Sequence, residues 1–95
     1  MLKSIDTNSL RYKLGTINVI DLRSIEKYNS SHIETSINIP FEKLMINHSK
    51  YLNKTDEYYL YCQYGKTSVK VCIFLNKLGY KVINLVGGYE AWLLN

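Results

Sequence analysis

The chain has 95 residues, of which 46% are hydrophobic and 21% are charged. This length supports one hydrophobic core but not two, and the composition excludes an intrinsically disordered chain. The formal charge of +4 comes from basic residues scattered along the sequence, which favours a mild attraction to anions and excludes the concentrated basic groove of a nucleic-acid-binding protein.

Segments rich in β-branched and aromatic residues alternate with segments of helical character along the chain. Strands are predicted at residues 1–6, 17–22, 36–39, 58–61 and 81–85. Helices are predicted at residues 9–14, 25–28, 41–45, 68–78 and 89–93, with an irregular polar segment at residues 47–54. This alternation is typical of an α/β fold. We expect a single domain over residues 1–95, with a mostly parallel five-stranded sheet and helices on both faces.

The helix predicted at residues 68–78 is apolar around nearly its whole circumference. Only Lys70, Asn76 and Lys77 are clearly polar in it. A helix of this composition is expected to be buried on nearly every side.

One stretch, Tyr58–Val69, joins a strand and a loop to this helix. Cys62 ends the strand, and the five residues after it contain Gly65. Ligands of α/β proteins usually bind at the carboxyl ends of the strands, where the next helix points its free N–H groups. These groups and the nearby Lys66 favour the thiolate form of Cys62, which makes Cys62 a candidate nucleophile. A buried, unreactive cysteine that closes the strand is the alternative.

Four other polar residues are candidates for a role at this site, but another role is expected for each. Asp21 and Arg23 end a strand and are expected to pair with each other or with the backbone, with a direct role at the site as the alternative. His32 is expected to form hydrogen bonds in a loop, and His48 to be solvated. The sequence has no Cys, His or Asp spacing of the zinc type, so we expect no metal and no other cofactor.

The positions of the two cysteines and the lengths of the apolar runs predict where in the cell the protein is located. Cys72 falls well inside the predicted helix, and the helical rise carries it away from Cys62, so both are expected to be free thiols. Free thiols are typical of a reducing environment. No apolar run has the length of a signal peptide or a membrane helix, so we expect a cytoplasmic location without a membrane partner.

Four patterns have a spacing that points to one family. They are a strand that ends in Asp-x-Arg, a Glu-x-x-x-x-x-His-Ile segment followed by Asn-Ile-Pro, a Cys-x-x-Gly-x-Thr-Ser loop, and a closing Leu-x-x-x-Gly-Tyr-x-Val-x-x-Leu-x-Gly-Gly-x-x-x-Trp. They lie, in this order, at Val19–Arg23, Glu26–Pro40, Cys62–Ser68 and Leu75–Trp92. From Ile17 nearly to its end, the chain therefore resembles the single-domain rhodaneses, which implies their three-layer fold.

The resemblance implies a sulfurtransferase. The Cys62 thiolate would attack the outer sulfur of thiosulfate or a persulfide donor and hold this sulfur as a persulfide. It would then pass the sulfur to a thiol, to cyanide or to a sulfur-carrier protein. Binding of the anionic donor is expected from loop amides, hydroxyls and the Lys66 charge, that is, from Gln63, Tyr64, Gly65, Lys66, Thr67 and Ser68.

The chain departs from the family pattern at two places. Where the family usually has Gly-His-Ile-Pro-Gly-Ala, residues 31–36 read Ser-His-Ile-Glu-Thr-Ser, which is expected to alter a turn without touching the chemistry. Thr67 stands where many members carry Arg, so Lys66 is the one cation of the loop. This second departure leaves the choice of sulfur donor open.

Two other functions are open to a chain with this pattern. A cysteine phosphatase or arsenate reductase needs a loop one residue longer, closed by an Arg that grips the oxyanion, but the residue six after Cys62 is Ser68 and no Arg follows Arg23. A catalytically weak module for protein binding or sulfur carriage is the second alternative, although protein binding alone has no need for a thiol at the start of the loop.

Overall fold

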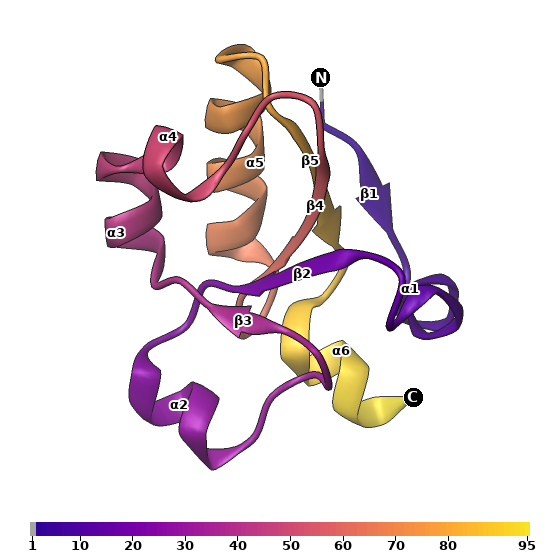
Figure 1. Ribbon diagram of the computed structural model, residues 1–95. Helices are drawn as coiled ribbons and strands as arrows, with labels where there is room; N and C mark the ends of the chain where they lie inside the picture. Colours follow the sequence, from indigo (N-terminus) through magenta and orange to yellow (C-terminus); the bar gives the residue numbers. More distant parts are fainter. Residues whose placement is uncertain (1) are drawn as a thin grey trace.

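The computed structural model describes residues 2–95, and within that range a five-stranded sheet forms its centre (Figure 1). The strands are β1 (Ser4–Ile5), β2 (Asn18–Asp21), β3 (Ile37–Asn38), β4 (Glu57–Tyr61) and β5 (Lys81–Leu85). Their order across the sheet is β1-β5-β4-β2-β3, and every neighbouring pair is parallel. The predicted α/β class and five-stranded sheet are confirmed. Met1, which belonged to the first predicted strand, lies outside the described residues.

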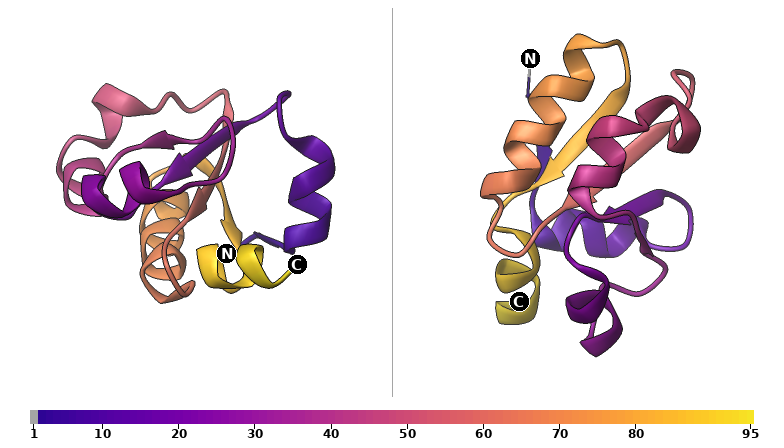
Figure 2. Two further views of the ribbon diagram at one scale, coloured as in Figure 1. Left: turned by 90° about the horizontal axis from the view of Figure 1, so that it is seen from below. Right: turned by 90° about the vertical axis from the view of Figure 1, so that its left-hand side faces the viewer.

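Helices cover both faces of the sheet (Figure 1, Figure 2). They are α1 (Thr7–Lys13), α2 (Ile25–Ser30), α3 (Phe41–Ile46), α4 (His48–Tyr51), α5 (Lys66–Lys77) and α6 (Gly88–Leu94). The α3, α4 and α5 helices lie on one face and α1 and α6 on the other, whereas α2 follows the carboxyl end of β2. No helix of residues 2–95 is long and apolar enough to cross a membrane.

Alternate residues of the central strands fill two separate hydrophobic cores. In β4, Tyr58 and Leu60 face α5, whereas Tyr59 and Tyr61 face α1 and α6. Successive side chains of a strand point to opposite faces, and a strand covered by helices on both faces must be apolar or hydrogen-bonded throughout. This is why the last four residues of β4 are all buried.

The α4 helix was not predicted from the sequence. It forms where residues 47–54 were expected to be irregular. Within it, His48 is half-buried, with its Nδ1 atom 2.8 Å from the hydroxyl oxygen of Tyr80 and its ring beside that of Phe74. The prediction that His48 is solvated is therefore wrong, because the short helix brings the imidazole against α5 and the chain that follows it.

The prediction that the central helix is buried on nearly every side is also wrong. The α5 helix begins at Lys66 and turns its buried residues toward the sheet. A helix that lies on a sheet contacts it along one side only, and no further layer covers the outer side of α5 (Figure 1). Ile73 and Phe74 of α5 and the residue that caps its end, Leu78, are each 38% exposed.

A buried carboxylate joins β2 to β4 and to the chain after α2. Asp21 is 0% exposed, and its carboxylate accepts hydrogen bonds from the backbone N–H and the guanidinium of Arg23. The ion pair between the two side chains measures 2.8 Å. Asp21 also accepts a 2.6 Å hydrogen bond from the hydroxyl of Tyr61, whose oxygen accepts one from the Ile33 N–H at 3.1 Å. The predicted pairing of Asp21 with Arg23 and the backbone is confirmed.

This network fixes the protonation of its members. Burial and the hydrogen bond to Asp21 raise the pKa of Tyr61, so its hydroxyl stays a donor. Burial by itself lowers the pKa of Arg23, but the hydrogen bond and the charge of Asp21 outweigh burial and raise this pKa. The Arg23 guanidinium therefore stays protonated in its ion pair with Asp21.

We expect Tyr61→Phe to lower the free energy of unfolding by about 1 to 3 kcal/mol, because it leaves a buried carboxylate oxygen and a buried N–H without this partner. Tyr59→Phe is the matched control. Tyr59 lies in the same strand on the same face, and its hydroxyl has no hydrogen-bond partner among residues 2–95, so the expected change is within about 0.5 kcal/mol. Urea unfolding measures both values, and equal losses would contradict the role given to Tyr61.

Thr35 has a left-handed backbone with φ of 70°, and it is the one non-glycine residue in the described part of the chain that does so. β-branched residues rarely adopt this left-handed conformation, because it costs about 1 to 2 kcal/mol of free energy per residue. Thr35 stands where the resembling family usually has Gly. The altered turn expected from the sequence therefore carries backbone strain.

Thr35→Gly is expected to raise the free energy of unfolding by about 0.5 to 1 kcal/mol, since relief of strain exceeds the added entropy of a glycine in the unfolded chain. Glu34→Gly, in the same turn but without a positive φ, should lower stability by a similar amount. Thermal midpoints of the two variants, measured against the parent protein, should move in opposite directions.

Candidate active site

Cys62 directly follows β4 at the carboxyl edge of the sheet. Only Gln63, Tyr64 and Gly65 separate it from α5, which begins at Lys66. The expected loop of five residues is therefore shorter, because its last two residues form the first turn of the helix. As a result, the N-terminal N–H groups of α5 lie close to the cysteine.

The sulfur of Cys62 is held by the backbone of this loop. The N–H of Gly65 donates to Sγ with an N···S distance of 3.1 Å, and the N–H of Ser68 donates at 3.2 Å. Cys62 is 7% exposed, so most of its surface is covered by protein. Two convergent N–H groups at a helix N-terminus stabilise negative charge on the atom that they enclose.

The Ser68 hydroxyl is held beside the sulfur by the neighbouring strand. Ser68 is 0% exposed, and its Oγ lies 3.3 Å from Sγ of Cys62. The hydroxyl donates to Oδ1 of Asn84 in β5 at 2.5 Å, and Asn84 is itself 3% exposed. Ser68 is therefore a buried wall of the sulfur site.

The loop is packed against the start of α6. The N–H groups of Tyr89 and Glu90 donate to the carbonyl oxygens of Cys62 and Gln63 at 2.9 Å and 3.0 Å. Gly65 has φ of +96°, and a Cβ atom there would lie 3.1 Å from the backbone N of Gly87. The close approach of two backbone segments requires a glycine at position 65.

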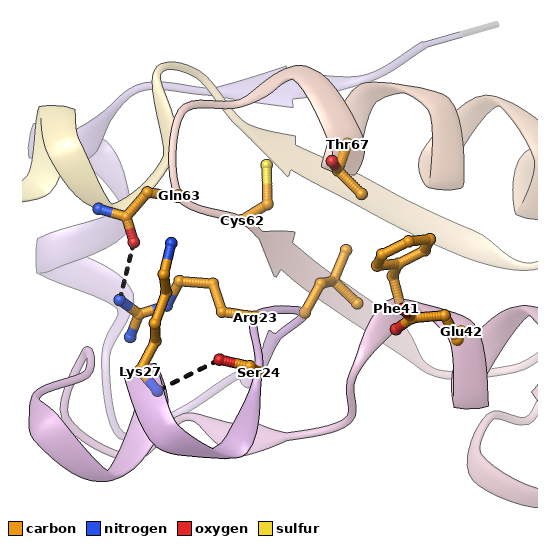
Figure 3. Close-up of a pocket in the computed structure, with 9 residues that line it drawn as sticks. Arg23, Ser24, Lys27, Phe41, Glu42, Cys62, Gln63 and Thr67 are labelled. Atoms are coloured by element: carbon orange, nitrogen blue, oxygen red, sulfur yellow. Dashed lines mark hydrogen bonds between the residues drawn. The ribbon is translucent and has the colours of Figure 1, made fainter.

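A cleft of about 300 Å³ opens beside Cys62 (Figure 3). Residues from the ends of β2 and β4 and from the starts of three helices line it: Leu22, Arg23, Ser24, Lys27, Phe41, Glu42, Cys62, Gln63 and Thr67. In Figure 3, the Lys27 side chain extends from α2 toward the loop that carries Cys62 and Gln63. Phe41, Glu42 and Thr67 lie on the other side of Cys62. We call this space the Cys62 cleft.

The structure divides the predicted site residues between two places. Gln63 and Thr67 line the Cys62 cleft with the cysteine. Lys66 and Tyr64 line a second hollow, of about 590 Å³, together with Gly65 and residues of β1 and β5. The structure therefore brings Lys66 near the loop backbone but not into the cleft.

Arg23 fixes one wall of the Cys62 cleft. Its guanidinium donates to Oε1 of Gln63 at 3.1 Å and to the carbonyl oxygen of Ser31 at 2.6 Å. Gln63 then donates through Nε2 to the carboxylate of Glu90 at 2.9 Å. A chain of hydrogen bonds thus runs from Asp21 through Arg23 and Gln63 to α6, and it holds the Gln63 side chain in place.

Sequence reasoning did not single out Ser24, Lys27, Phe41 or Glu42 for the site. Ser24 caps α2, Lys27 lies in α2, and the other two residues lie in α3. All four are more than 15 positions before Cys62, and they meet it only because β2 pairs with β4. The strand order could have predicted these residues, since the carboxyl ends of neighbouring parallel strands lie at one edge of the sheet. The sequence patterns alone do not specify that order.

Cys72 has a different environment from Cys62. It is 0% exposed, lies in the middle of α5 and is a free thiol. Burial, with a smaller contribution from the nearby Cys62, raises the pKa of Cys72 to about 12. Cys72 is therefore a neutral core residue at ordinary pH.

Two relatives of similar length are named as sulfurtransferases. The putative sulfurtransferase YtwF of Bacillus subtilis is 30% identical over 94 residues, which cover 96% of this chain and 90% of YtwF. The thiosulfate sulfurtransferase GlpE of Coxiella burnetii is 31% identical over 81 residues, which cover 84% of this chain and 75% of GlpE.

Other relatives are longer than this chain. The putative sulfur carrier protein YrkF of Bacillus subtilis is 35% identical over 78 residues, which cover 81% of this chain but 42% of YrkF. A probable molybdopterin-synthase adenylyltransferase of Porphyra purpurea is 32% identical over 75 residues, which cover 78% of this chain and 20% of that protein. The chain thus spans less than half the length of these two relatives.

The fold and a family pattern point the same way. The crystal structure of a rhodanese-like domain protein from Staphylococcus aureus has a TM-score of 0.87 and 31% identity, and the match covers 96% of this chain and 91% of that one. The family pattern described as the rhodanese-like domain matches residues 6–95. This chain therefore belongs to the rhodanese-like domain family.

Proposed function

We propose that the protein is a sulfurtransferase that carries sulfane sulfur on Cys62. The proposal rests on one observation. Cys62 lines a cleft, and its sulfur accepts hydrogen bonds from the N–H groups of Gly65 and Ser68, with N···S distances of 3.1 Å and 3.2 Å. N–H groups placed in this way stabilise negative charge on sulfur, and sulfur transfer needs a negatively charged sulfur nucleophile. The names of the relatives YtwF and GlpE support the same reaction class.

In the first step, the Cys62 thiolate attacks the outer sulfur of the donor. With thiosulfate, a new S–S bond forms at Cys62, the bond between the two donor sulfurs breaks, and sulfite leaves with its electron pair. The persulfide keeps one negative charge. The N–H groups of Gly65 and Ser68 are placed to stabilise this charge, because they already point into the sulfur site.

In the second step, an acceptor thiolate attacks the outer sulfur of the persulfide. The S–S bond at Cys62 breaks, the thiolate of Cys62 is restored, and the acceptor leaves as a persulfide. Gln63 and Thr67, which line the cleft, are proposed to contact donor and acceptor. Lys66 and Tyr64 are proposed to act from the second hollow, through the loop backbone.

The donor and acceptor are proposed by class. Thiosulfate or a persulfide is the donor, in keeping with the name of GlpE, and a thiol, cyanide or a sulfur-carrier protein is the acceptor, in keeping with the name of YrkF. We propose a cytoplasmic location, in keeping with two free cysteines, which are typical of a reducing compartment.

The phosphatase alternative has no support in the site. Ser68 occupies the position at which such enzymes close the loop with Arg, and its hydroxyl is buried against Asn84. Arg23, which lines the cleft, is tied to Asp21, Ser31 and Gln63.

We expect the protein to gain the mass of one sulfur atom when it is incubated with thiosulfate, and to lose this mass on addition of cyanide or dithiothreitol. Intact mass spectrometry measures both changes. Cys62→Ser should not gain the sulfur. Cys72→Ser is the control and should gain it, because Cys72 is buried and its pKa is raised to about 12. Sulfur found on Cys72 would refute the assignment, and a protein that gains no sulfur from any donor would favour a binding module.

Gly65→Ala should reduce the rate of sulfur uptake at least tenfold, since the added methyl group presses on Gly87 and moves the N–H groups around the sulfur. Gly79→Ala is the matched control. Gly79 has a similar φ of +100°, but a Cβ atom there meets only the flexible side chain of Lys54, at 3.6 Å. Both variants should lose about 1 kcal/mol of stability from backbone strain, but only Gly65→Ala should lose activity. Equal activity in the two folded variants would remove the amide site from the mechanism.

A further inference from the structure

The charges that line the Cys62 cleft are arranged as a dipole. Its three charged residues are Arg23, Lys27 and Glu42. Arg23 is neutralised by Asp21, its buried partner at 2.8 Å. Once the Arg23–Asp21 pair is set aside, one positive charge, on Lys27, and one negative charge, on Glu42, remain in the lining.

These two remaining charges have no partner among residues 2–95. Lys27 and Glu42 are both exposed, and neither side chain makes an ion pair or a hydrogen bond within residues 2–95. They lie on opposite sides of Cys62, with Lys27 on α2 and Glu42 on α3 (Figure 3). Both charges are therefore available to a ligand whose sulfur meets Cys62.

The size of the cleft fits a small ligand. Its volume of about 300 Å³ corresponds to about ten water molecules, which is room for a molecule of amino-acid size. The apolar side chains of Leu22 and Phe41 also line it, so a short carbon chain has a surface to pack on. A thiol that bears an ammonium and a carboxylate group on such a chain matches all three features.

We propose that Lys27 and Glu42 select a small zwitterionic aminothiol, of the cysteine type, as the sulfur acceptor. This inference rests on the proposed function. The acceptor carboxylate pairs with Lys27, its ammonium pairs with Glu42, and its thiolate is directed to the persulfide of Cys62. Charges of both signs favour such an acceptor over a thiol that bears only a carboxylate or only an ammonium group.

The transfer step is balanced in atoms and charge. The acceptor thiolate attacks the outer sulfur of the Cys62 persulfide and forms a new S–S bond. The old S–S bond breaks, its electron pair returns to Cys62 as a thiolate, and the acceptor leaves as a persulfide. No external oxidant or reductant takes part.

The test uses the full chain charged at Cys62 with inorganic polysulfide, which makes it independent of thiosulfate. Four acceptors of similar size are compared: cysteine, cysteamine, 3-mercaptopropionate and 2-mercaptoethanol. The loss of the extra sulfur is followed by rapid quench and intact mass. Each rate constant is divided by that of the parent protein with the same acceptor and then by the ratio for 2-mercaptoethanol, which removes differences in intrinsic thiol reactivity.

Lys27→Gln should lower the normalised rate constant about threefold for cysteine and 3-mercaptopropionate and leave cysteamine unchanged. Glu42→Gln should lower it about threefold for cysteine and cysteamine and leave 3-mercaptopropionate unchanged or faster. Lys43→Gln and Glu26→Gln are matched controls, since both residues are exposed on the same two helices outside the cleft lining, and neither should alter any ratio.

The outcomes separate this inference from the function on which it rests. If Cys62 takes up no sulfur, the proposed function falls, and this inference falls with it. If Cys62 takes up sulfur and passes it to all four thiols with ratios that match the controls, only the selection by Lys27 and Glu42 is refuted. The crossed pattern of losses establishes the selection, because a general change in folding or in cysteine reactivity moves all four acceptors together.

Discussion

The buried carboxylate of Asp21 is the interaction on which the site depends. It binds the Arg23 guanidinium in the same turn and the Tyr61 hydroxyl from β4, and Tyr61 in turn holds the backbone of Ile33. Removing one partner would leave a buried charge unpaired, which is costly in free energy. Because Tyr61 precedes Cys62, the network fixes the end of the strand next to the proposed nucleophile, and through Arg23 it also fixes Gln63.

Two helix starts meet at the loop above this network. The N-terminal amides of α5 point at the sulfur of Cys62, and those of α6 bind the carbonyl oxygens of Cys62 and Gln63. The backbone of the loop is thus held from both sides before any ligand arrives. Such preorganisation lets the amides stabilise charge on sulfur without rearrangement during the reaction.

The charged side chains of the Cys62 cleft do not come from the loop that carries Cys62. The loop cation Lys66 faces the second hollow, whereas the cations of the Cys62 cleft come from the turn after β2 and from α2. The loop therefore supplies the sulfur of Cys62 and the two amides that donate to it. The surrounding helices supply Lys27 and Glu42, which differ in sign and so give the cleft its polarity.

The sequence by itself determined the order of the elements, the α/β class and the position of the Cys62 loop, because these follow from local patterns of apolar, glycine and capping residues. It misjudged α5, since an apolar circumference does not reveal on how many sides a helix is covered. Only the tertiary structure decided which charged residues line the cleft beside Cys62. Pairing of β2 with β4 brings Lys27 and Glu42 to Cys62, and strand order depends on contacts between distant segments that no local pattern encodes.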